Sequence, residues 1–267
     1  MILCGGIILL AIVKVKNHIE SYKIKSFSED IHDLSGRNDN KLTMFRNQII
    51  KNNIRSSFED VVIDIGCGDA TLLNSIQQEV GNGFGIVPSS EEKVRLEKEY
   101  YHPNIHFLEG LSVALPIKDE IATIVICNGV IILLESEDDV IRSLQEIKRV
   151  TKKNGTVWIG EVPFLDEVEY NGKNYGDSIL KWLLFIYKNN GFISFIKASK
   201  RLIRAIFCGE TFLINPKKIY FIKPENFVEL SEKIGFEVMN FFKSKILNDN
   251  LEEEDSSTRY DYILRKR

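Results

Sequence analysis

The chain has 267 residues, 44% hydrophobic and 27% charged, which is enough apolar material for a domain with a buried core. Its formal net charge of -3 and pI near 5.9 argue against a nucleic-acid partner, because nucleic-acid-binding domains are usually basic. The four cysteines are widely scattered and fit neither a disulfide framework nor a zinc site. We therefore expect a cytoplasmic protein without a bound metal, and the composition indicates no particular oligomeric state.

The chain opens with an almost wholly apolar run at residues 1–13, which is followed by Lys14 and Lys16. This run is too short for a membrane-spanning helix, which needs about 20 residues. No basic segment precedes it, as one would in a secretory signal. We expect a helix that packs on the protein or touches a membrane, with a true membrane anchor as the less favoured alternative, within an N-terminal helical segment of residues 1–57.

From residue 61 to about residue 160, short β-branched runs alternate with amphipathic stretches. This alternation is typical of parallel strands joined by helices. Ser89 and Glu92 form a predicted capping box at the start of one of these helices. The expected strands cover residues 61–65, 84–87, 105–108, 123–127 and 156–159.

Two further strands are expected near the end of the sequence, at residues 236–242 and 260–264. A helix before them should begin at Pro224 and end at Gly235, a residue type that favours the C-terminal cap of a helix. Residues 58–267 therefore predict an α/β domain with a doubly wound, mostly parallel seven-stranded sheet.

A glycine-rich loop follows the first expected strand of this sheet, with Gly66 and Gly68 between that strand and a helix. Glycines at this place let the backbone turn tightly and approach a ligand. A dinucleotide-binding loop would have a third small residue at position 71, which is Thr71 here. The acids Asp64 and Asp69 suit a ligand with an amine and a sulfonium, so the charges favour a methyl donor.

Residues 64–69, Asp-Ile-Gly-Cys-Gly-Asp, resemble the first motif of the class I S-adenosylmethionine-dependent methyltransferase family. Residues 104–116 resemble the third-strand segment of that family, and residues 144–155 resemble its helix and turn before strand five. The resemblance covers about 100 residues with the motifs in order. It implies a Rossmann-like methyltransferase fold and an enzyme that uses S-adenosylmethionine.

The resemblance also implies where the methyl donor would bind. The two glycines would face its methionine part, Asp64 would hold the loop or the amino group, and Asn128 would lie near the same end. Residues 87–89 would meet the ribose, and residues 111–112 the adenine. The donor-site residues expected in this way are Asp64, Gly66, Cys67, Gly68, Asp69, Val87, Ser89, Leu111, Ser112 and Asn128.

The sequence departs from the family at three positions that commonly carry an acid, which here are Val87, Leu111 and Thr123. The first of these acids usually binds the ribose hydroxyls. One interpretation is that other groups, such as Ser89, Ser90 or Glu91, take over the ribose contact. The alternative is a non-catalytic protein that keeps the fold and binds a membrane or a protein partner. The intact glycine loop favours the enzyme.

An unusual segment, residues 178–209, contains six lysines and arginines among many apolar residues and no acid. Insertions at this place in the family commonly form a lid, so residues 171–222 are expected to form a helical lid. The segment could be an ordinary lid, a lid that also contacts a membrane or lipid, or a helix that binds a partner protein. Its charge favours an anionic or lipid-linked acceptor. The layout resembles methyltransferases that act on small molecules or on cell-surface sugars and their lipid carriers.

Methyl transfer needs mainly an aligned acceptor, with a base if the acceptor is a hydroxyl. Glu161 follows the fifth strand at the edge of the sheet where such folds bind ligands, and it is the first candidate base. His32, in a polar segment before the first strand, is the second. Each has a plainer alternative, since Glu161 could cap a loop and His32 could be a solvated surface residue.

Overall fold

The computed structural model describes residues 12–14, 17–28, 30–37, 39–164, 179–208, 212–214, 220–248 and 250–267. The chain divides into two compact units. The smaller contains Met1–Ser21 and Glu167–Lys218, and the larger contains Tyr22–Asp166 and Ile219–Arg267. Residues 22–57 thus cluster with the sheet, whereas the predicted domain boundary lay at residue 57.

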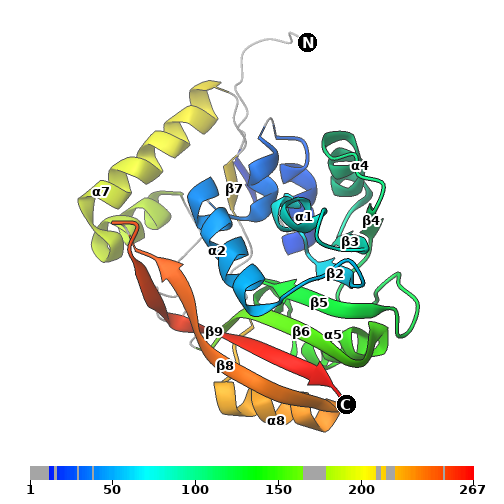
Figure 1. The fold of residues 1–267 in the computed structure, drawn as a ribbon. Coiled ribbons are helices and arrows are strands. Elements are labelled where there is room, and N and C mark those ends of the chain that lie inside the picture. The colour runs from blue at the N-terminus through cyan, green and yellow to red at the C-terminus, as the bar shows by residue number, and fades with distance from the viewer. Residues whose placement is uncertain are drawn as a thin grey trace. The chain divides into compact units, whose positions relative to one another are not determined.

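The larger unit is built on one seven-stranded sheet with the strand order β4-β3-β2-β5-β6-β9-β8 (Figure 1). The first five strands in this order run parallel, and β9 is antiparallel to both of its neighbours. The sequence prediction of a mostly parallel seven-stranded sheet is confirmed. The strands are β2 (Val61–Ile65), β3 (Asn82–Val87), β4 (Ile105–Glu109), β5 (Ala122–Asn128), β6 (Thr151–Pro163), β8 (Phe236–Leu247) and β9 (Glu253–Lys266).

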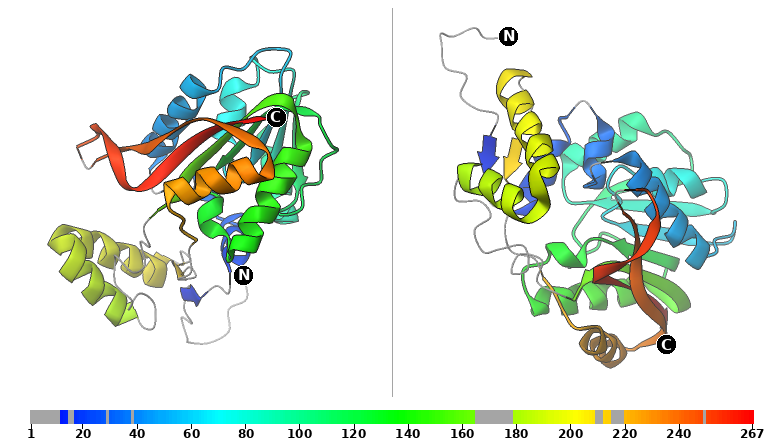
Figure 2. Two further views of the ribbon diagram at one scale, coloured as in Figure 1. Left: turned by 90° about the horizontal axis from the view of Figure 1, so that it is seen from below. Right: turned by 90° about the vertical axis from the view of Figure 1, so that its left-hand side faces the viewer.

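Helices cover both faces of this sheet. Alternate residues of each central strand point to opposite sides, and because these residues are apolar on both sides, each face needs a covering layer. Val62 and Ile124 pack with α2, α3 and α4, whereas Ile63 and Val125 pack with α5 and α8. Figure 2 shows α5 and α8 on the side of the sheet opposite α2. These helices are α2 (Asn40–Asn53), α3 (Thr71–Ile76), α4 (Ser90–Glu99), α5 (Glu137–Val150) and α8 (Pro224–Ile234). The unit also has two short 3-10 helices, η1 (Ile31–Ser35) and η2 (Ile131–Leu133).

The predicted helix ends are confirmed. The Ser89 side chain accepts a hydrogen bond from the Glu92 backbone and so caps α4. Pro224 lies in the first turn of α8, and Gly235 ends it in the left-handed conformation at φ 108°. The sheet order reverses between β2 and β5, where helices leave for opposite faces. A crevice for a ligand is expected at the carboxyl ends of these two strands.

In the smaller unit, β1 (Ile12–Lys14) pairs in parallel with β7 (Phe212–Ile214). The predicted N-terminal helix is therefore wrong for residues 12 and 13, and its residues 1–11 lie outside the described part of the chain. The predicted helical insertion is present as α7 (Ile179–Cys208), with non-helical backbone at Gly191. The remaining helix, α1 (His18–Lys25), comes first in the chain and spans the boundary between the units. None of the described helices is long and apolar enough to cross a membrane.

Candidate functional site

The glycine loop lies at the carboxyl end of β2, as predicted. Gly66 and Gly68 have φ values of 69° and 57°, a conformation that side chains with a Cβ rarely adopt. A Cβ on Gly66 would lie 2.6 Å from a methyl carbon of Val130, and one on Gly68 would lie 2.9 Å from the Leu34 carbonyl oxygen. Gly66 is nevertheless exposed. The loop therefore presents open backbone that a ligand can approach closely.

Asp64 is a buried carboxylate at the end of the same strand, with a relative exposure of 4%. No group among the described residues donates a hydrogen bond to its side chain. Burial, followed by the charge of Asp69, raises the pKa of Asp64 to about 7. Because buried polar groups in proteins are nearly always hydrogen-bonded, this carboxylate is suited to a partner that comes from outside the chain. An ammonium group fits this requirement.

Asp69, the second acid of the motif, is already engaged by the protein. Its carboxylate accepts hydrogen bonds from the Thr71 hydroxyl at 2.8 Å and from the Thr71 backbone at 3.2 Å. It also lies 2.9 Å from Nδ1 of His32, which belongs to η1. His32 thus lies against the glycine loop. This placement is compatible with its predicted role, and it leaves Nε2 3.5 Å from the Ser35 hydroxyl.

At the expected ribose position, Ser89 and Val87 offer little to a ligand. The Ser89 hydroxyl both caps α4 and donates to the Glu92 carboxylate at 2.8 Å. Val87 is buried, and its carbonyl accepts from the Gly110 backbone.

Glu92 is an acid in this region to which the sequence assigned only a capping role. It is 1% exposed, and burial raises its pKa to about 7 although the Ser89 hydrogen bond opposes the rise. After burial and the charge of Asp64, the charge of Glu92 also raises the pKa of the buried Cys67 thiol. Glu92 is thus a buried acid in the first turn of α4, the helix that follows β3.

The two residues expected at the adenine differ in what they expose. Leu111 is 39% exposed and forms an isolated bridge with Ala114. The Ser112 hydroxyl is buried and lies 2.8 Å from the Ser143 hydroxyl of α5. Leu111 therefore provides an open apolar surface, whereas the Ser112 side chain belongs to the protein interior.

A buried arginine network lies beside the carboxyl ends of β5 and β6. Arg46 of α2 is 2% exposed and donates to both carboxylate oxygens of Asp261, at 2.7 and 2.6 Å. It also donates twice to the side-chain oxygen of Asn128, at 2.9 and 2.7 Å, and its guanidinium lies 5.3 Å from the Trp158 ring centre. A Cβ on Gly160 would overlap this network. Asn128 is therefore held by the protein, which the sequence did not predict.

Glu161 lies in the same network, with a φ of 57°. Its carboxylate pairs with Arg37, lies 3.5 Å from Arg259, and accepts a hydrogen bond from the Asn128 amide at 3.1 Å. Burial favours a raised pKa, but the charges of Arg37, Arg46 and Arg259 outweigh it and lower the pKa to about 2. An acid this strong accepts a proton poorly, which argues against a general-base role and favours a positioning role.

Replacing Glu161 with glutamine should lower the free energy of unfolding at pH 7 by up to about 3 kcal/mol. The folded-state pKa lies below the ordinary value of 4.5, so the ionised group stabilises the protein above pH 4.5. This stabilisation is lost as the pH falls towards 2. Urea unfolding at pH 7 and pH 3 should show the difference between wild type and variant shrink by at least half. The control is Glu237, an exposed residue that forms an ion pair with Arg265. Glu237→Gln should alter the free energy of unfolding by less than about 1 kcal/mol at either pH.

The central part of the chain matches known proteins. Residues 63–159 match a family described as a methyltransferase domain. A curated relative, an uncharacterized methyltransferase of Schizosaccharomyces pombe, is 31% identical over 134 residues, which are 46% of this chain and 47% of the relative. The match thus spans about half the length of that relative.

Two solved structures share the fold. A SAM-dependent methyltransferase of Methanosarcina mazei has a TM-score of 0.55 at 16% identity, over 82% of this chain and 96% of its own. The N-methyltransferase NodS of Bradyrhizobium japonicum, solved in complex with S-adenosyl-L-homocysteine, has a TM-score of 0.58 at 9% identity, over 94% of this chain and 99% of its own. At these identities the likeness shows the fold alone.

Proposed function

We propose that the chain is a class I S-adenosylmethionine-dependent methyltransferase that transfers a methyl group from S-adenosylmethionine to a small-molecule, lipid-linked or sugar-linked acceptor, because its central part matches a methyltransferase domain and a methyltransferase relative. The observation that carries the proposal is the Asp64 carboxylate, which is 4% exposed, lies near the open backbone of Gly66 in sequence and accepts no hydrogen bond from the described residues. Both lie where the strand order reverses, the usual ligand position of this architecture.

The residues present fit the donor. Asp64 would bind its amino group, and Gly66 and Gly68 would let the backbone approach its methionine part. Leu111 would lie against the adenine. When bound, S-adenosylmethionine supplies a methyl group activated by its sulfonium.

On the acceptor side, the arginines support an acceptor with an anionic group. Arg37 and Arg259 approach Glu161, and their side chains are 22% and 29% exposed. Arginine binds carboxylates and phosphates well because its donors form a planar fork. These side chains would hold the acceptor, and alignment of its reactive atom can supply much of the rate.

If the acceptor is a hydroxyl, we assign the removal of its proton to His32 and not to Glu161. If Nδ1 of His32 donates to Asp69, as the 2.9 Å distance allows, Nε2 is the ring nitrogen that can accept a proton, with the Ser35 hydroxyl 3.5 Å away. Glu161 would then hold Arg37 and Arg259 in place.

Titration calorimetry with S-adenosyl-L-homocysteine tests the donor site. We expect micromolar binding, and no binding of NADH, the ligand of the competing dinucleotide class. Folded protein that does not bind S-adenosyl-L-homocysteine would contradict the proposal. Turnover of S-adenosylmethionine with glycolipid and sugar-nucleotide pools then separates an enzyme from a non-catalytic binding protein.

A further inference from the structure

The long helix α7 has a charge distribution that the donor and acceptor sites do not explain. Its 30 residues include no aspartate or glutamate. They include six basic residues, which are Lys181, Lys188, Lys197, Lys200, Arg201 and Arg204. A helix that only packs on its own protein usually carries charges of both signs on its solvated face. The single sign of α7 suggests a negatively charged partner.

The second half of α7 exposes a stripe of large apolar side chains. Phe192, Ile196 and Ile203 are 62%, 37% and 53% exposed. Their spacings of four and seven residues place them on one face of a helix. Ile193, which is 73% exposed, lies next to this stripe, and the exposed Lys197 and Lys200 lie one turn after Ile193 and Ile196. An apolar stripe bordered by lysines is typical of helices that lie in a membrane interface.

The first half of α7 repeats the arrangement. Leu180, Leu184 and Tyr187 are 69%, 49% and 50% exposed and follow one another at spacings of four and three residues. Lys188 is exposed beside them. Single exposed apolar residues are ordinary, but each of the two helical stretches of α7, which meet at the non-helical Gly191, exposes a set of large apolar side chains that water covers unfavourably.

We propose that α7 is a docking surface for an anionic lipid bilayer. Its apolar side chains would enter the boundary between headgroups and acyl chains, and its lysines would meet the negatively charged headgroups. The helix would lie on the membrane and not cross it, in agreement with the lack of a membrane-crossing helix in the described part of the chain. This inference does not depend on methyl transfer.

Sedimentation with vesicles tests the docking surface directly. The full chain should bind vesicles of equimolar phosphatidylcholine and phosphatidylglycerol, and it should bind phosphatidylcholine vesicles at least tenfold more weakly. The double change Lys197→Glu/Lys200→Glu should reduce partitioning at least about tenfold, because each basic residue near an anionic surface contributes about 1 kcal/mol. Phe192→Ser/Ile203→Ser should reduce it by a similar factor, since apolar burial is lost.

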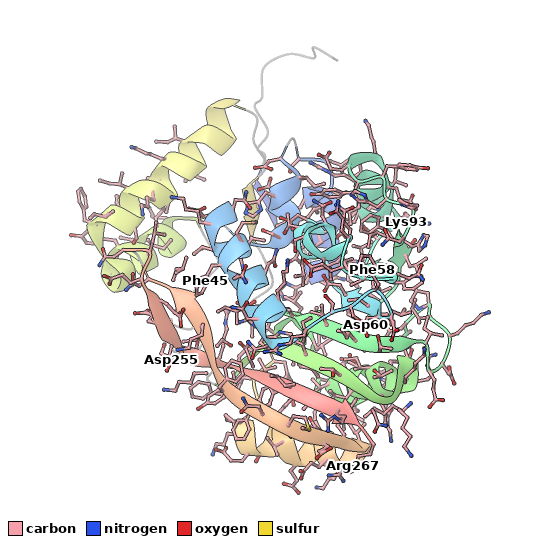
Figure 3. The ribbon with its side chains drawn as sticks, viewed as in Figure 1. Phe45, Phe58, Asp60, Lys93, Asp255 and Arg267 are labelled. Carbon is pink, nitrogen blue, oxygen red and sulfur yellow. The ribbon has the colours of Figure 1, made fainter. Side chains whose placement is uncertain are left out.

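Matched controls come from the larger unit. Lys152→Glu/Lys153→Glu makes the same change in net charge at exposed lysines of β6. Phe58, on the loop before β2, is 75% exposed and can be changed to serine (Figure 3). Both controls should keep wild-type partitioning. The proposal would be overturned if the chain did not bind vesicles, if it bound neutral vesicles equally well, or if the control variants lost as much binding. Binding of S-adenosyl-L-homocysteine reports separately on the donor site.

Discussion

Replacing Arg46 with methionine is expected to lower the free energy of unfolding by about 3–5 kcal/mol, as removal of one partner of a buried ion pair usually does. Asp261 is fully buried, and without Arg46 the described residues would compensate its charge only by hydrogen bonds from the Ser244 hydroxyl and the Glu161 backbone. Urea unfolding at pH 7 measures the loss. Donor binding should weaken as well, because Arg46 holds Asn128 at the end of β5.

The surface residue Arg142 provides the matched control. It pairs with Asp139 and its side chain is 59% exposed, so Arg142→Met should cost no more than about 1 kcal/mol. The double variant Arg46→Met/Asp261→Asn should be less destabilised than the sum of its single changes, since it leaves no unpaired charge. Strict additivity would show that the two side chains do not act as a pair.

Replacing Asp64 with asparagine is expected to change stability and ligand binding in opposite directions. The folded-state pKa of about 7 lies above the ordinary value of 3.8. The folded protein therefore binds more protons between these values, and its stability falls as the pH rises from about 4 to 7. Asparagine removes this fall, so the variant should gain up to about 4 kcal/mol at pH 8. It should also bind S-adenosyl-L-homocysteine at least tenfold more weakly, because the partner of the amino group is lost.

The pH dependence of binding separates this role from a general loss of structure. Wild-type affinity for S-adenosyl-L-homocysteine should rise as the pH increases through 7 and Asp64 ionises, and the Asp64→Asn variant should lack this rise. Asp138→Asn, at an exposed position in α5, should change neither stability nor affinity by more than about 1 kcal/mol. Unchanged affinity in Asp64→Asn would remove Asp64 from the donor site.

The central strands could be predicted from sequence because both of their faces are buried and their residues are continuously apolar. β2 has the predicted bounds, 61–65. β8 and β9 are longer than predicted. Their outer parts were missed because much of their length is exposed and therefore carries no continuous apolar pattern. β1 was mistaken for helix because an apolar run has no periodicity of its own. Its strand partner, β7, lies about 200 residues further along the chain.

The site divides in the same way between local and distant contacts. The glycine loop and Asp64 are contiguous in sequence, so their geometry could be predicted. The pairing of Arg46 with Asp261 joins residues 215 positions apart, and no local pattern marks either of them. Glu161 was located at the correct edge, but its three arginine neighbours, which decide its acidity, come from three other parts of the chain.

The position of β9 between β6 and β8 bears on how the protein is made. β9 is the last of the seven strands to leave the ribosome, yet it contributes the carboxylate that neutralises Arg46. Until it emerges, β8 has no neighbour in the sheet and Arg46 lacks the carboxylate to which it donates hydrogen bonds. The larger unit can therefore complete its sheet only after nearly all of its residues have been synthesised, which exposes the edge of β6 to chaperones or to aggregation during translation.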